Sequence, residues 1–190
     1  MILSNSKSTA ILLAGIALCA AIPGPAQDRG QGDRNFVTRA VEISNGEVLT
    51  SRVAAEKSAS PDVKQFAQRM IGEQGQLSQV VAPLAAQVNA TLAPGQTSAA
   101  QLRAAARLQT LSGPAFDQQY IRGQIADLVY ALRIYQSEIA TTQDPGLKKT
   151  AADGAKIITA HLRMADRLAQ VRQIPLSARQ PATTVRTAAH

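Results

Sequence analysis

Three ionisable residues interrupt stretches of the chain in which apolar residues repeat every three or four positions. Glu47, Glu73 and His161 each stand at a position of such a repeat. In a helix this spacing keeps the repeating positions on one side, which faces the protein core. Carboxylate and imidazole groups bind metals such as Fe, Mn and Zn, and a buried charge otherwise needs a protein partner. The pattern therefore predicts either a metal site or a buried polar network.

A fourth candidate, Asp127, directly precedes Leu128 on another helical segment. Together with Glu47, Glu73 and His161 it completes the set that could converge inside a helical bundle and hold one divalent metal such as Fe, Mn or Zn. The alternative is a polar network without metal, in which Glu47 accepts a hydrogen bond from His161 while Glu73 and Asp127 turn to the bundle surface. Leu128 favours this alternative, because it leaves the apolar repeat of its segment unbroken.

Five helical segments position these residues, and no alternating strand pattern occurs in the sequence. Pro83 should kink or split the second segment. Short turns join the first segment to the second and the fourth to the fifth, which predicts two antiparallel helical hairpins. The expected fold is an all-α, antiparallel four-helix bundle of two hairpins, with a short helix in the crossover connection. The segments start or end with Ser-Pro, Gly-Pro and Asp-Pro signals and cover residues 35–58, 61–89, 99–111, 113–142 and 145–172.

The N-terminus has the pattern of an export signal. Lys7 precedes a short apolar run over residues 9–22, which is shorter than the ~20 residues that span a membrane. We expect a signal peptide over residues 1–26, cleaved before Gln27, with cleavage after Ala21 as the alternative. The single cysteine, Cys19, would leave with the signal, so the mature chain would contain no disulfide.

The formal net charge of +7 indicates a basic protein, and much of the excess follows the last helix. We expect a linker over residues 27–34, the bundle domain over 35–172 and a disordered basic tail over 173–190. The tail could touch an anionic membrane surface, although a simply solvated tail fits its composition better. A nucleic-acid partner is not expected, because no basic run is interleaved with aromatic residues.

Five stretches resemble a family of secreted bacterial helical proteins of unknown function, whose members are often labelled outer-membrane proteins and have a ferritin-like fold. The similar stretches are residues 36–40, 54–58, 60–70, 111–117 and 160–162.

The resemblance also implies a degenerate metal site. The family carries Asp-His where this chain has Glu73-Gln74, and a second Asp-His where this chain has Asp127-Leu128. Its third histidine is kept as His161. Two of the three family histidines are therefore missing.

Ferritin-like metal sites also use a glutamate three residues before a ligand histidine, and here Ile158 holds that position before His161. We therefore expect an exported, non-enzymatic protein of the cell envelope without a cofactor, periplasmic or associated with the outer membrane, in an envelope or stress-related role. The alternative is a ferritin-like protein that binds a single divalent metal or handles oxidants. The sequence identifies no protein partner, and a homo-oligomer remains open.

Overall fold

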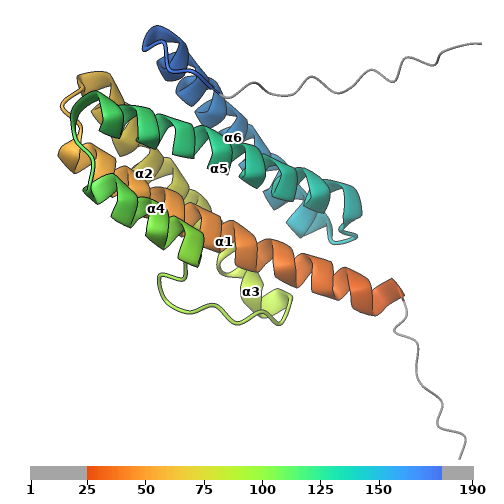
Figure 1. Cartoon of the computed structure of the whole chain (residues 1–190). Helices are drawn as coiled ribbons and strands as arrows, with labels where there is room; N and C mark the ends of the chain where they lie inside the picture. Colours follow the sequence, from red (N-terminus) through yellow and green to blue (C-terminus); the bar gives the residue numbers. More distant parts are fainter. Residues whose placement is uncertain (1–24, 177–190) are drawn as a thin grey trace, which may run out of the picture.

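The computed structural model describes residues 25–176, and every regular element in this range is a helix. Four long helices form the body of the molecule (Figure 1): α1 (Pro25–Lys57), α2 (Pro61–Val81), α5 (Gly113–Thr141) and α6 (Pro145–Val171). Two short helices, α3 (Leu84–Gln87) and α4 (Ala99–Gln109), lie in the connection between α2 and α5. The expected all-α bundle of two hairpins is confirmed. No helix of the described part is long and apolar enough to cross a membrane.

Helices α1 and α5 run antiparallel across the two hairpins. Ser51 shares a hydrogen bond of 2.9 Å with the hydroxyl of Tyr120, and Arg39 donates to the hydroxyl of Tyr130 at 2.8 Å. Residue numbers therefore fall along α5 as they rise along α1. Helices α2 and α6 also pack on each other, which closes the four-helix square.

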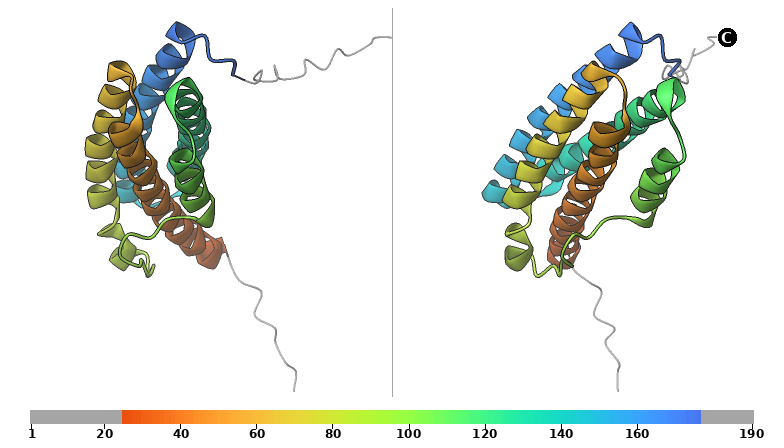
Figure 2. Two further views of the ribbon diagram at one scale, coloured as in Figure 1. Left: turned by 60° about the vertical axis from the view of Figure 1, so that its left-hand side comes forward. Right: turned by 90° about the vertical axis from the view of Figure 1, so that its left-hand side faces the viewer.

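The crossover connection packs on the outside of this square. Pro83 separates α2 from α3, as expected, and α4 then lies along α1 (Figures 1 and 2). The side-chain amide of Gln101 donates to the carbonyl of Ile43 at 3.3 Å. A Cβ at Gly46 would stand only 2.0–2.3 Å from the amide atoms of Gln101. The absence of a side chain at Gly46 thus allows α4 to reach the backbone of α1.

A cluster of polar side chains centred on Asp117, here called the polar clamp, connects the helices at one end of the bundle. Its side chain is 5% exposed and accepts hydrogen bonds from Ser58 at 2.6 Å, Ser60 at 2.5 Å and Arg172 at 3.2 Å. Arg172 also bonds Asp62 at 2.5 and 3.2 Å, and these bonds lower the pKa of Asp62. Ser60 holds the N-cap position of α2 but makes no side-chain cap; its hydroxyl donates to Asp117 instead. The clamp ties the α1–α2 turn to α5 and α6.

The N-terminal part of the bundle differs from the expectation. Residues 27–34, expected as a linker, are helical because α1 already begins at Pro25. Proline suits a first helical turn, where its missing N–H costs no hydrogen bond. Gln31 then donates to Asn35 at 2.9 Å along the same helix. Residues 1–24 of the expected signal peptide lie outside the described residues. Residues 177–190 of the expected tail also lie outside them.

The core-facing side of α2 also differs from the expectation in the second half of the helix. The repeat predicts Glu73 and Val80 in the core, but Gln74 and Val81 are buried instead, and Val80 is 59% exposed. At about 100° per residue, Gln74 and Val81 stand within about 40° of the direction of the buried Met70, whereas Glu73 and Val80 are about 60–80° away from it. Glu73 and Val80 therefore reach only the edge of the core. The corresponding predictions for Glu47 on α1 and His161 on α6 are correct, since both are fully buried.

Candidate functional site

A chain of hydrogen bonds through His161 crosses the bundle core. Its Nε2 donates to Glu73 Oε2 at 2.5 Å, and its Nδ1 accepts from the side-chain amide of Gln74 at 3.4 Å. Gln74 Oε1 in turn accepts from the hydroxyl of Ser44 at 3.1 Å. This order of donors assigns a neutral imidazole protonated at Nε2. Burial lowers the pKa of His161 and thereby favours the neutral form, although the bond to Glu73 opposes it.

Glu73 anchors this chain at the edge of the core. Its side chain is 34% exposed, and its second oxygen pairs with Arg69 Nε at 2.7 Å. Burial disfavours the charge on Glu73, but the hydrogen bond from His161 and the pairing with Arg69 outweigh burial and lower the pKa of Glu73. Glu73 is therefore an ionised group that holds both the imidazole and a surface arginine.

Glu47 lies in the core without any such support. It is fully buried, and neither carboxylate oxygen has a hydrogen-bond partner among the described residues. Burial raises the pKa of Glu47 well above its ordinary value, and the charge of Asp127 adds to the rise. The bond from His161 to Glu47 that the sequence suggested is not formed, because His161 bonds to Glu73. The structure thus places a carboxyl group without a hydrogen-bond partner among the described residues in the middle of the bundle, where burial favours its protonated form.

Asp127 stands between the core and a surface cavity of about 290 Å³ beside α1 and α4. Burial raises the pKa of Asp127 to about 6. Near this level of the bundle, the amide of Gln124 donates to Thr50 at 3.1 Å, while Gln124 Oε1 has no partner within the described part of the chain. The charge of Asp127 on α5 acts on Glu47 on α1, so these two carboxyl groups are linked electrostatically and not by a hydrogen bond.

The four residues predicted as one site are thus divided into two pairs, Glu73 with His161 and Glu47 with Asp127. Across residues 25–176, no group of three or more His, Cys, Asp or Glu side chains could hold a metal ion. The Nδ1 lone pair of His161, which a metal would need, already accepts a hydrogen bond. These residues do not fit a ferritin-like metal centre.

Two apolar residues at expected ligand positions also argue against a metal centre. Leu128 and Ile158, which stand where the family and the ferritin-like pattern place ligands, are buried core residues with 0% and 1% exposure. Ordinary packing fills these positions.

Sequence reasoning missed several polar members of the core. It did not single out Ser44 or Gln124, although both lie at helical spacing on core-facing sides. It also missed Glu138, which is 3% exposed. Burial first, then the nearby carboxyl groups of Asp33 and Asp144, raise the pKa of Glu138 to about 7. The signal for Glu138 was its position three residues after the buried Tyr135.

The fold and the core together define a ferritin-like helical bundle. A solved structure with the same fold is a two-domain protein from Anabaena variabilis that contains DJ-1/ThiJ/PfpI-like and ferritin-like domains. The TM-score is 0.57 at 12% identity over 84% of this chain. The chain spans only 42% of that protein, so the likeness concerns the fold alone.

The chain belongs to the family described as domain of unknown function DUF4142, whose model matches residues 20–168. The resemblance noted in the sequence is thereby confirmed. No curated protein matches the chain.

Proposed function

We propose that the protein is an exported, non-enzymatic helical-bundle protein of the cell envelope, which acts through its surface in an envelope or stress-related role. The supporting observation is the chain of hydrogen bonds through His161. Both ring nitrogens are engaged with Glu73 and Gln74, so the one histidine that the family pattern retains serves the packing of the core. The surface of the bundle carries a groove between α2 and α6.

A metal titration tests the proposal about the core. The protein from Gln27 on would be titrated calorimetrically with Fe(II), Mn(II) and Zn(II), in the native form and as His161→Gln. We expect no stoichiometric binding that depends on His161. One-to-one binding by the native protein that is lost in His161→Gln would overturn the proposal.

Export rests on Lys7 and the apolar run that follows it. Expression in a bacterial host followed by fractionation would locate the protein, and N-terminal sequencing would define the cleavage site. We expect a periplasmic or membrane-associated chain that begins at Gln27, or at Ile22 if cleavage follows Ala21. A cytoplasmic chain with an intact N-terminus would contradict export.

A second candidate is a ferritin-like protein that binds a single divalent metal. The observation in its favour is the pair of unpartnered oxygens on Glu47, on which the carboxyl group of Asp127 also acts. Such oxygen donors suit Mn(II) better than Zn(II). In the same titration, this candidate requires binding that Glu47→Gln abolishes and His161→Gln leaves unchanged.

A further inference from the structure

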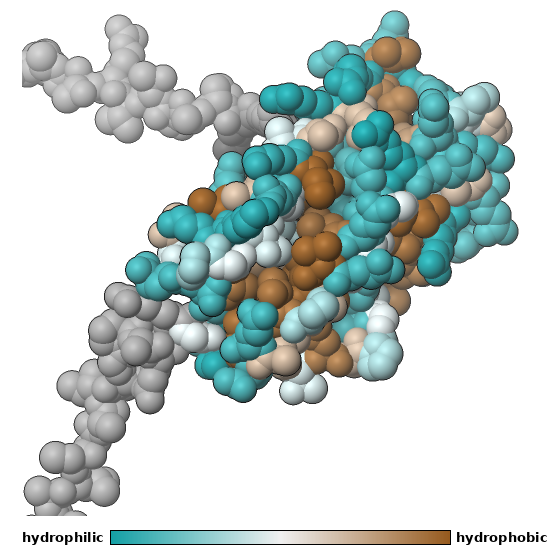
Figure 3. All heavy atoms as spheres, turned by 180° about the vertical axis from the view of Figure 1, so that it is seen from behind, coloured by the Kyte–Doolittle hydropathy of each residue, from teal (hydrophilic) through white to brown (hydrophobic). Residues whose placement is uncertain are grey.

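A groove lies between α2 and α6. These two helices are on the side of the bundle that faces away from α4 (Figure 2). Figure 3 shows this side of the molecule, where hydrophobic residues gather in a band between ridges of hydrophilic residues. The groove has a volume of about 470 Å³. Ligand sites for small molecules have volumes of about 300–1,000 Å³, so the groove is large enough to hold one.

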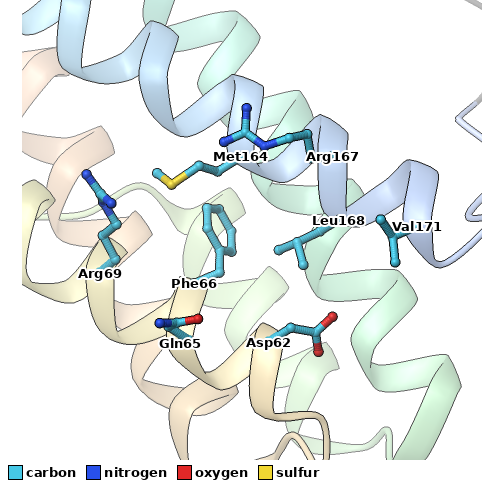
Figure 4. Close-up of a pocket in the computed structure, with 8 residues that line it drawn as sticks. All are labelled: Asp62, Gln65, Phe66, Arg69, Met164, Arg167, Leu168 and Val171. Atoms are coloured by element: carbon cyan, nitrogen blue, oxygen red, sulfur yellow. The ribbon is translucent and has the colours of Figure 1, made fainter.

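The floor of the groove is apolar. Phe66 of α2 faces Met164 and Leu168 of α6 across the space between the helices, and Val171 extends the floor toward the end of α6 (Figure 4). Val171 is 78% exposed, which is the largest exposure of any large apolar residue in the described part. Met164 and Val171 are seven residues apart, so the apolar floor is about 10 Å long at 1.5 Å per helical residue. A flexible methionine lets such a surface adapt to its ligand.

The rim of the groove is positively charged. Arg167 of α6 has no ion-pair partner among the described residues, and Arg69 of α2 uses only its Nε atom to pair with Glu73. The one acid that lines the groove, Asp62, is already paired with Arg172. Guanidinium groups are well suited to bind carboxylates through two parallel hydrogen bonds.

We propose that this groove binds a medium-chain fatty acid. The alkyl chain lies along Phe66, Leu168 and Val171, where it removes exposed apolar surface from water. The carboxylate meets the guanidinium groups of Arg69 and Arg167. The proposal goes beyond the proposed function, because it rests on the groove and not on where the protein resides.

Calorimetry with laurate, kept below its micelle concentration, tests the proposal on the protein from Gln27 on. Dodecyltrimethylammonium serves as a probe with the same chain length and the opposite charge. We expect one laurate per protein and no measurable binding of the cationic probe. Because Val171 and Arg167 are both exposed, Val171→Gln and Arg167→Gln leave the core intact, and thermal unfolding verifies this.

Each groove variant has a matched control outside the groove. Val80→Gln replaces an exposed valine on α2, and Arg163→Gln replaces an exposed arginine one turn before Arg167. We expect Val171→Gln to weaken laurate binding about tenfold, since the buried area of one valine is lost, and Arg167→Gln to weaken it about fivefold. The control substitutions should change the affinity for laurate by less than about twofold.

Three results would overturn the proposal. The first is the absence of saturable laurate binding. The second is an equal loss in the groove variants and in their controls. The third is equally tight binding of the cationic probe, which would show that the arginines do not select the ligand. If laurate fails to bind and light scattering shows a dimer that Val171→Gln dissociates, the groove is an interface between two copies of the chain.

Discussion

Replacement of Glu47 by Gln should make the free energy of unfolding less dependent on pH. Glu47 is fully buried without a hydrogen-bond partner in the described part of the chain, and burial raises its pKa well above the ordinary 4.5. The folded protein therefore keeps a proton on Glu47 at pH values where the unfolded chain has released it. Since the unfolded state then binds fewer protons, stability falls as pH rises from 4.5 toward the raised pKa.

The slope of this loss follows from proton linkage. One proton corresponds to about 1.4 kcal/mol of unfolding free energy per pH unit. A glutamine has no such proton, and its amide has nearly the size and shape of the protonated carboxyl group. The stability of Glu47→Gln relative to the native protein should therefore rise with pH inside this window, with a slope of up to about 1.4 kcal/mol per pH unit.

Urea unfolding followed by circular dichroism at pH 4.5, 5.5 and 6.5 would measure this difference. Glu56→Gln is the matched control, because Glu56 lies on the same helix but is exposed. We expect the control to show no difference that changes with pH. If the difference between Glu47→Gln and the native protein is the same at all three pH values, the fold does not hold a proton on Glu47 and the reasoning is refuted.

Three further predictions concern stability and use the same urea assay. Asp127→Asn should stabilise the protein more above pH 6 than at pH 4. Burial raises the pKa of Asp127 to about 6, so the native protein loses stability as pH rises toward 6, whereas the asparagine variant does not. Gly154→Ala should destabilise by about 1–3 kcal/mol, since its Cβ would lie 2.3 Å from a ring carbon of the buried Tyr135. Arg172→Gln should cost about 1–3 kcal/mol, because the buried Asp117 loses a charged donor.

Each of these predictions has an outcome that would contradict it. A stability difference for Asp127→Asn that is independent of pH would mean that Asp127 has an ordinary pKa. Gly72→Ala is the control for Gly154→Ala, because a Cβ at Gly72 meets nothing within 4 Å. We expect this control to stabilise by about 0.5–1 kcal/mol through helix propensity, and equal effects at the two glycines would refute the packing argument. An Arg172→Gln variant as stable as Arg163→Gln would show that the clamp contributes nothing.

Local signals in the sequence were sufficient to predict most helix boundaries. Asp144 caps α6 by accepting from the backbone N–H of Leu147 at 2.8 Å, and Pro83 separates α2 from α3. Such signals act over a few residues, so they can be read without knowledge of the neighbouring helices. The start of α1 was missed because the polar residues before position 35 carry no apolar repeat.

The candidate site was predicted less well, because it depends on how helices are placed against each other. The sequence indicated that Glu47 and His161 are buried, and both are. It did not indicate that His161 would bond to Glu73 and leave Glu47 without a partner. The partner of a buried group is decided by the relative position of two helices, and a shift of one residue changes which side chains meet.

By itself, the sequence determined the helical class, the two hairpins and the burial of Glu47 and His161, since these follow from spacing along single segments. The tertiary structure alone decided that Gln74 replaces Glu73 on the core side of α2 and that α2 and α6 leave an apolar groove between them. The physical reason is the 3.6-residue turn of the helix. At 3.6 residues per turn, several neighbouring positions lie near the core-facing side, and only packing against the other helices selects which of them is buried.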